Sequence, residues 1–101
     1  MSNAFAVRRN EDRMAMQLAV YVSGHQQHPG VETSLTEDIS PHGARVRTKR
    51  EWRADEHLVL AALRGSFQSL ARVAYCKSRE GEEGFVVGVE FVRPEGHWTR
   101  K

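Results

Sequence analysis

Residues 38–48, which read DISPHGARVRT, decide how the rest of this chain is interpreted. In the first six positions every residue except Ile39 is polar or turn-forming, and the next five alternate between apolar and polar side chains. This pattern predicts a tight turn at 38–43 that enters a half-buried strand at 44–48. The side chains of Asp38 and Ser40 can bond to the local backbone or reach a ligand. Gly43 suits a position that needs positive φ or the close approach of another molecule.

Segments with strand-like alternation lie on both sides of this turn, and no segment of ten residues has a convincing helical period. On the N-terminal side, strands are predicted at 14–23 and 31–38. On the C-terminal side, they are predicted at 44–48, 57–63, 69–78 and 85–92. The connections at 24–30, 49–56, 64–68 and 79–84 are rich in glycine, proline or charged residues, which is typical of loops and hairpin turns.

The alternation also predicts which side chains share a face of a strand. The predicted sets are Leu18, Val20 and Val22 in the first strand, Ala71, Val73 and Tyr75 in the fifth, and Phe85, Val87, Val89 and Phe91 in the last. Cys76 should therefore lie on the face opposite to Tyr75. Trp52, in the 49–56 connection, is expected to pack against the body of the domain.

Six short strands without a helix predict an all-β domain, and 101 residues provide for one core but not for two. A six-stranded antiparallel small barrel is favoured because closure removes exposed strand edges. Residues 1–7 are assigned to a tag remnant or disordered leader, and 8–101 to a single domain. Within that domain, 8–14 form a flexible arm, 15–92 the barrel, and 93–101 a short tail that Pro94 separates from the last strand.

Composition narrows the classes of function. The net charge of +2 is too small for bulk nucleic-acid binding, although arginine outnumbers lysine by twelve to three. Arginine recognises phosphate and guanine edges through two parallel hydrogen bonds, but a GC-rich coding bias produces the same excess. A single cysteine, Cys76, fits a reducing compartment. Without an apolar run of about 20 residues or a signal peptide, we expect a cytoplasmic domain without membrane insertion.

The N-terminal segment 8–13 is charged and has no apolar anchor, so we expect an exposed arm. Arg9 and Arg13 are four residues apart in it, and Arg8 is adjacent. Several guanidinium groups on such an arm have little structural purpose without an anionic partner. A solvated N-terminus without function is the alternative that these residues alone leave open.

Taken together, the arm and the turn resemble the PilZ domain family. The chain has Arg-x-x-x-Arg at 9–13, then 24 intervening residues, then Asp-x-Ser-x-x-Gly at 38–43, followed by an all-β remainder. The resemblance extends from about Arg8 to Val92 and includes Thr36, the strand that begins GARV, and the closing VGVEF at 87–91. It implies a PilZ-like barrel of the split-barrel type that binds the bacterial second messenger cyclic di-GMP and catalyses no reaction.

The resemblance also implies the roles of individual residues. Arg9 and Arg13 would meet the phosphates and the O6/N7 edge of guanine, with Arg8 assisting. Asp38, Ser40 and Gly43 would hold a guanine from the other side. A bidentate arginine–guanine contact contributes about 1–3 kcal/mol of discrimination. Ordering the arm costs roughly 1–2 kcal/mol of backbone conformational entropy per residue. Ligand binding and arm closure should therefore be coupled. A downstream protein partner is implied as well. The resemblance does not decide whether the protein is a monomer or a dimer.

Other functions are weaker hypotheses. A PilZ-like adaptor that binds proteins without a ligand is the first alternative, and a barrel for single-stranded nucleic acid is the second. His25 and His28 would supply only half of a metal site, so no metal is expected. No motif for a nucleophile surrounds Cys76. No nucleophile elbow accompanies Asp38 and Ser40, so no enzymatic activity and no cofactor are expected apart from the ligand cyclic di-GMP.

Overall fold

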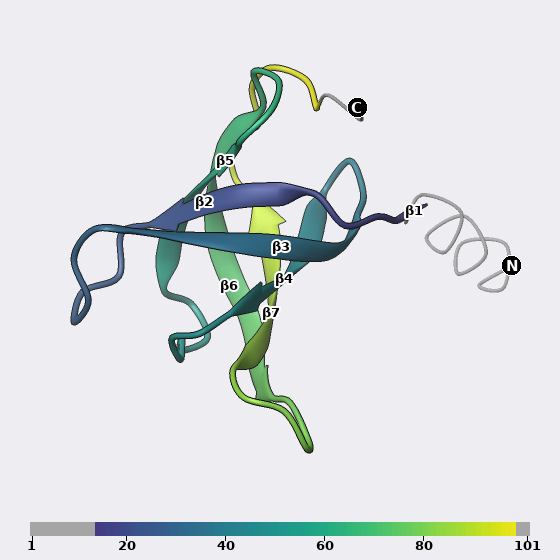
Figure 1. The fold of residues 1–101 in the computed structure, drawn as a ribbon. Helices are drawn as coiled ribbons and strands as arrows, with labels where there is room; N and C mark the ends of the chain where they lie inside the picture. The colour runs from purple at the N-terminus through teal and green to yellow at the C-terminus, as the bar shows by residue number, and fades with distance from the viewer. Residues whose placement is uncertain (1–13, 99–101) are drawn as a thin grey trace, which may run out of the picture.

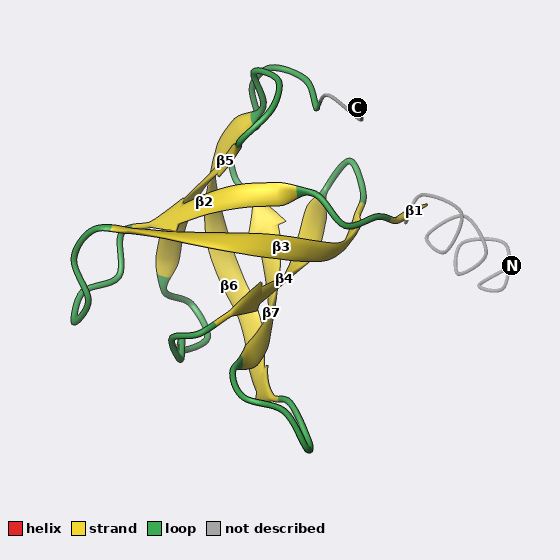
Figure 2. Cartoon of the chain, in the orientation of Figure 1, coloured by secondary structure: helices red, strands yellow, loops and turns green. Residues whose placement is uncertain are grey.

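The alternating segments form seven antiparallel strands in the computed structural model, which describes residues 14–98 (Figures 1 and 2). Apolar side chains at every second position turn to one side of each strand and can be buried together, because successive side chains of a strand point to opposite faces. No helix occurs between residues 14 and 98. The strands are β1 (Met14–Ala15), β2 (Ala19–Ser23), β3 (Val31–Ile39), β4 (Gly43–Thr48), β5 (His57–Ala62), β6 (Gln68–Ser78) and β7 (Phe85–Phe91).

Six of the strands close into a barrel. Their order is β3-β2-β5-β6-β7-β4, and the pairing of β4 with β3 joins the two ends of the sheet. β1 is the additional strand and pairs only with β3. The predicted all-β six-stranded antiparallel barrel is therefore confirmed, and its closure leaves no long open edge among the six strands.

The predicted first strand at 14–23 is wrong in one respect, because it is interrupted between β1 and β2. The cause is Thr36 on β3, which is fully buried. Its hydroxyl donates to the carbonyl of Met16 at 2.6 Å and accepts from the N–H of Leu18 at 2.8 Å. The Thr36 hydroxyl thus replaces backbone hydrogen bonds to the segment between β1 and β2. This happens near the β-bulge of β3 between Thr36 and Asp38.

The core lies inside the barrel and consists of the inward side chains of all six strands. Val20, Val22, Val46, Leu58, Leu60, Val73 and Val87 are all at most 2% exposed. Trp52 is 3% exposed, so the prediction that it packs against the body is confirmed. Phe85 and Phe91 pack against this core from the same face of β7 as Val87 and Val89, as the alternation predicts. Burial of these side chains is the main stabilising contribution.

The predicted face of Tyr75 is wrong. A bulge between Val73 and Tyr75 shifts the pairing of β6 with β7 by one position. Because one extra residue reverses the alternation beyond a bulge, Cys76 packs against the core. The Tyr75 ring lies instead over Gly88, where an added Cβ would be 2.2 Å from its Cε2 atom.

The C-terminal residues 93–98 fold back onto the turn between β5 and β6. Gln68 and Glu95 exchange two backbone hydrogen bonds of 2.9 Å, and the carbonyl of His97 accepts from Ser66 and Phe67. Trp98 stacks on Phe67 with ring centroids 4.3 Å apart and planes inclined by 13°. The segment predicted as a polar tail therefore covers one end of the barrel.

Candidate functional site

The Asp-x-Ser-x-x-Gly residues surround the connection between β3 and β4, but they do not all lie in a turn. Asp38 belongs to β3, which continues to Ile39, so the prediction that the turn begins at Asp38 is wrong. Asp38 is only 2% exposed. The turn itself spans 40–42, and β4 begins at Gly43.

The buried Asp38 carboxylate forms an ion pair with Arg45 of β4. The Nε atom of Arg45 donates to Oδ2 of Asp38 at 2.6 Å, and its Nη2 atom contacts the same oxygen. Bonding to Asp38 raises the pKa of Arg45, against an opposing effect of burial. The Arg45 side chain is 44% exposed, whereas that of Asp38 is 3% exposed. Asp38 therefore holds a permanently charged guanidinium group at the barrel surface.

Ser40 and Gly43 have structural roles in the turn. Oγ of Ser40 accepts from the N–H groups of His42 and Gly43 at 3.3 and 3.2 Å, and the N–H of Ser40 donates to the carbonyl of Gly43 at 2.8 Å. Gly43 does not have a positive φ. A Cβ at this position would lie 2.2 Å from the carbonyl oxygen of Val89, so the close approach that Gly43 permits is that of β7.

The predicted arginines Arg8, Arg9 and Arg13 lie outside the described residues. The structure does show where the chain goes directly after them. Met14 pairs with Ile39, and Ala15 pairs with Asp38. The residue that follows Arg13 in the chain thus lies opposite Ile39, the residue between Asp38 and Ser40.

Three residues beside the motif, Arg45, Tyr75 and Lys77, were missed by sequence reasoning. Asp38 pairs with Arg45, Arg45 with Gly88, and Gly88 with Tyr75, so the four form one row across β3, β4, β7 and β6. The Nζ atom of Lys77 lies 5.3 Å from the centre of the Tyr75 ring. This surface combines an aromatic ring with two cations, Arg45 and Lys77. Gly88 inside a strand is the one sequence signal for it, because such a glycine marks a close approach.

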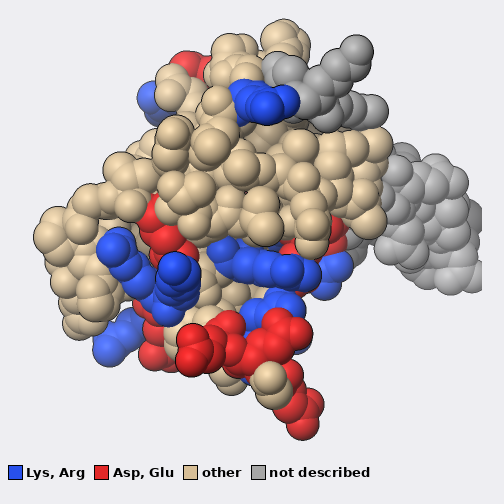
Figure 3. Space-filling view, in the orientation of Figure 1, with Lys and Arg blue, Asp and Glu red and all other residues tan. Residues whose placement is uncertain are grey.

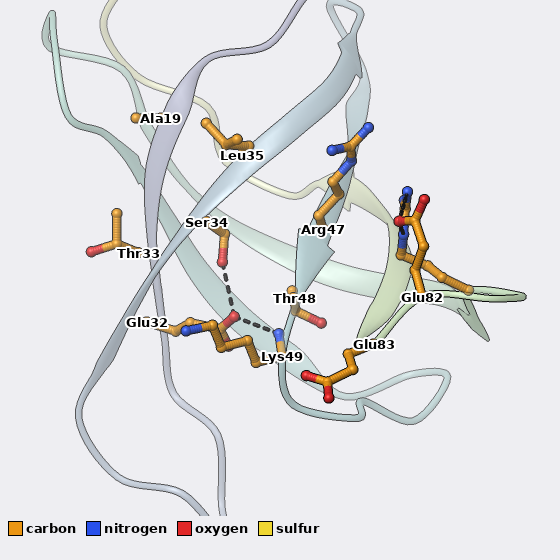
Figure 4. A pocket seen from close by; sticks show the side chains of 11 residues that line it. Ala19, Glu32, Thr33, Ser34, Leu35, Arg47, Thr48, Lys49, Glu82 and Glu83 are labelled. Atoms are coloured by element: carbon orange, nitrogen blue, oxygen red, sulfur yellow. Dashed lines mark hydrogen bonds and ion pairs between the residues drawn. The ribbon is translucent and has the colours of Figure 1, made fainter.

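A groove of about 340 Å³ lies on the same side of the barrel, between β3, β4 and the β6–β7 hairpin. Figure 4 shows Arg47, Lys49, Glu82 and Glu83 around it. Figure 3 shows lysine and arginine side chains gathered in the lower half of the view, directly next to acidic ones. The groove is therefore lined by paired charges and not by a uniformly basic surface.

Glu37 is the acidic centre of these pairs. It accepts from Arg47 at 3.0 Å and from Arg79 at 2.6 Å. Burial acts to raise the pKa of Glu37, but the hydrogen bonds and charges of the two arginines together outweigh it, so the pKa lies below its ordinary value. Arg79 also bonds to Glu82 in the hairpin loop. These contacts fasten the β6–β7 hairpin to the strand that carries Asp38.

A second cavity of about 440 Å³ opens on the other side of the turn, at the end of the barrel. Ser40 and Pro41 form part of its lining, and the other residues are mostly apolar or aromatic: Met14, Ile39, Phe67, Phe91, Gly96 and Trp98. Its volume is within the range of small-molecule sites. The turn thus has a charged surface on one side and an apolar cavity on the other.

The remaining candidate groups are engaged in structural contacts. Nε2 of His25 lies 2.8 Å from the carbonyl of Glu51, and Nδ1 accepts from the N–H of Gln27, so both ring nitrogens are occupied. Within residues 14–98 no three His, Cys, Asp or Glu side chains are grouped so that they could hold a metal ion. Burial raises the pKa of the Cys76 thiol, against the effect of the N–H of Trp52, and a protonated thiol is a poor nucleophile.

A closed small barrel whose surface presents cations and an aromatic ring beside a polar turn has the features of a binding domain. The family model of the PilZ domain matches residues 7–97, nearly the whole chain, so this protein belongs to the PilZ domain family. PilZ domains are receptors for cyclic di-GMP and not enzymes, and they often interact with partner proteins. The comparisons with curated proteins and with solved structures found no match. The described part of the chain contains no helix that could cross a membrane.

Proposed function

We propose that this protein is a receptor for cyclic di-GMP, which binds between the N-terminal arginines and the Asp38–Gly43 region. The pairing of Met14 with Ile39 is the observation that carries this proposal. Met14 directly follows Arg13 in the chain, and Ile39 lies between Asp38 and Ser40, which supports a site that both parts of the motif share. Two phosphates and two purines require guanidinium groups, base-edge partners and a flat apolar surface, and all of these chemical types are present around this point.

Arg9 and Arg13 contact the phosphates and a guanine O6/N7 edge, with Arg8 beside them. Asp38 accepts from the N1–H and N2–H₂ donors of a guanine, and Ser40 and Gly43 keep the turn in shape below it. Because Arg45 occupies Oδ2 of Asp38 in the structure, access of guanine to this carboxylate requires the Arg45 side chain to swing outward. Arg45 is then free to pair with a phosphate, and the Tyr75 ring offers a surface for stacking.

In the proposed mechanism, ligand binding transmits the signal by ordering the N-terminal arm. Fixing the arm costs roughly 1–2 kcal/mol of backbone entropy per residue, so the arm closes only when the arginine contacts compensate for that cost. The closed arm presents a different surface to a downstream protein. In this mechanism the barrel stays unchanged, and the ordered arm is the output.

Titration calorimetry with cyclic di-GMP, GTP and a short oligonucleotide tests the proposal. We expect saturable binding of cyclic di-GMP alone. The binding should be lost in Arg13→Ala and much reduced in Asp38→Ala, with melting curves to verify the fold. Arg53→Ala, at an exposed position of the connection between β4 and β5, is the matched control and should bind normally. Undiminished binding by Arg13→Ala would remove the proposed site.

Amide hydrogen exchange tests the closure of the arm independently of ligand binding. Exchange at residues 6–14 should slow when cyclic di-GMP is added. If the ligand binds but exchange there does not change, the receptor function stands and the arm mechanism is wrong.

A ligand-free protein adaptor is the second candidate, and the Asp38–Arg45 pair favours it. A buried carboxylate already satisfied by an arginine needs no ligand. Absence of binding heat with cyclic di-GMP, together with capture of a partner protein that depends on the barrel surface, would support this function instead.

A further inference from the structure

The outer surface of β3, β2, β5 and β6 is apolar over several strands. Seven large apolar side chains on this side of the barrel are between 41% and 58% exposed: Tyr21, Val31, Leu35, Val59, Leu63, Leu70 and Val92. Single exposed apolar residues are normal, but a contiguous group marks an interaction site. We refer to these seven residues, with Ala19, Ser23, Thr33, Ala61 and Gln68 between them, as the apolar face.

Strand register shows that the apolar face is contiguous. Directly paired residues of antiparallel strands turn to the same side. One row runs from Val31 through Ser23 and Val59 to Leu70, whose carbonyl bonds to the N–H of Val92. A parallel row contains Thr33, Tyr21, Ala61 and Gln68. A third joins Leu35 to Ala19, whose carbonyl bonds to the N–H of Leu63.

None of these twelve positions carries a charge. Charged residues lie directly beyond them: Arg47 pairs with Leu35 on β4, and Arg72 follows two residues after Leu70 on β6. Figure 3 views the molecule from the side of β2 and β3 and shows this part of the apolar face as a continuous uncharged area above the charged groove.

We infer that the apolar face is the interface of a twofold homodimer of this chain. The shape of its centre favours a second copy. Tyr21 is the one aromatic side chain of the apolar face, and its directly adjacent residues are small: Ala19 and Ser23 on β2, and its cross-strand partners Thr33 and Ala61. A twofold axis beside Tyr21 places the ring of each copy over the small residues of the other, which makes the surface complementary to itself.

The aromatic side chain at the centre and the distribution of charges agree with this interface. A standard interface buries about 800 Å² on each partner, with an aromatic anchor at its centre and a polar rim. The apolar face fits this anatomy, with Tyr21 near its centre and Arg47 and Arg72 beyond its margin. Two copies that meet here bring no like charges together, although the chain carries a net charge of +2. The dimer uses residues other than Asp38, Arg45 and Tyr75, although β3 and β6 carry residues of both surfaces.

Analytical ultracentrifugation of the full chain without ligand tests the inference over protein concentrations from about 10 µM to 1 mM. The mass should rise from the 11.5 kDa of the monomer toward twice that value. Tyr21→Glu and Val59→Glu should each weaken association about tenfold or more, and circular dichroism should show that they are folded. Ser78→Glu, at an exposed position at the end of β6, should leave association unaltered.

A disulfide trap locates the contact. In a Cys76→Ser background, Tyr21→Cys should form a covalent dimer on mild oxidation, and Ser78→Cys should not. A wild-type mass that stays at the monomer value over the whole range would overturn the inference, as would a dimer that persists in both glutamate variants. Neither experiment involves cyclic di-GMP, so the outcome is independent of the proposed function.

Discussion

At the scale of single residues, buried polar groups decide where the strands of this barrel start and stop. Thr36 has no exposed surface and satisfies both a donor and an acceptor of the segment between β1 and β2. Asp38, two positions later, is also buried and directs Arg45. Both residues lie in β3 at the point where the N-terminal segment joins the barrel, so the geometry of the proposed site depends on them.

Replacing Thr36 with valine tests this role. The variant keeps the shape of the side chain but leaves the Leu18 N–H and the Met16 carbonyl without their partner. We expect the free energy of unfolding to fall by about 1–3 kcal/mol, measured by urea denaturation. Thr33→Val, at an exposed position of the same strand, is the matched control and should change it by less than about 0.5 kcal/mol. Equal effects of the two changes would contradict the role of the Thr36 hydroxyl.

The lowered pKa of Glu37 predicts a dependence of stability on pH. A carboxylate whose pKa is depressed by folding stabilises the protein above its ordinary value of 4.5, and this contribution is lost as the pH falls through the lower value of the folded state. Glu37→Gln should therefore lower the melting temperature by roughly 2–5 °C at neutral pH. The difference from wild type should shrink as the pH falls below 4.5, because the Glu37 carboxylate of the wild type is then progressively protonated.

Glu83→Gln, at an exposed position of the same groove, is the control and should have a smaller effect. A deficit of Glu37→Gln that stayed constant from neutral to acidic pH would show that the ion pairs with Arg47 and Arg79 are not its cause.

At the scale of elements, the bulge in β6 determines what the surface near Asp38 presents. Without the extra residue, Tyr75 would point into the barrel and Cys76 outward. With it, the Tyr75 ring lies across β7 at Gly88, next to Arg45 in the same cross-strand row. A bulge of this kind redirects a side chain at a functional surface.

A double-mutant cycle tests the contact between Gly88 and Tyr75. The Cβ of Gly88→Ala would lie 2.2 Å from the tyrosine ring, so we expect a loss of stability of about 1–3 kcal/mol. In a Tyr75→Ala background the same change should cost much less, because no ring is displaced. Additive effects of the two substitutions in denaturant unfolding would mean that the ring does not occupy this position.

At the scale of the whole molecule, charged and apolar surface lie next to each other on one barrel. The proposed ligand site includes Asp38 on β3, Arg45 on β4 and Tyr75 on β6, and the apolar face covers β2 and β5 with parts of β3 and β6. The C-terminal residues close one end by backbone bonds to the β5–β6 turn and by the stacking of Trp98 on Phe67. The two proposed interaction surfaces therefore share the strands β3 and β6 but use different residues of them.

The two tryptophans allow the contribution of this end closure to be measured. Trp98 is half-buried and packs at the margin of the core, whereas Trp52 is 3% exposed. We expect Trp52→Ala to lower the free energy of unfolding by about 3–5 kcal/mol. Trp98→Ala should lower it less, on the order of 1–2 kcal/mol. Thermal and urea unfolding measure both. A larger loss for Trp98→Ala would show that the end closure, and not the barrel interior, dominates stability.

The positions of the strands along the chain could largely be predicted, because they depend on local sequence. The period of two located all six barrel strands, and loop residues such as Gly24 and Gly30 marked their connections. The family resemblance, based on the spacing of the arginines and the Asp-x-Ser-x-x-Gly residues, is confirmed by the PilZ match. The ligand contacts of the individual residues stay predictions.

The sequence alone was sufficient for the class of fold and the family, since alternation and motif spacing are properties of neighbouring residues. Only the tertiary structure decided that Asp38 is buried against Arg45, that Tyr75 turns outward, and that seven apolar side chains form one face. The physical reason is that alternation tells which residues of a strand share a side but not which strands are neighbours. Register and bulges arise from pairing between distant segments, and a shift by one residue reverses every side chain beyond it.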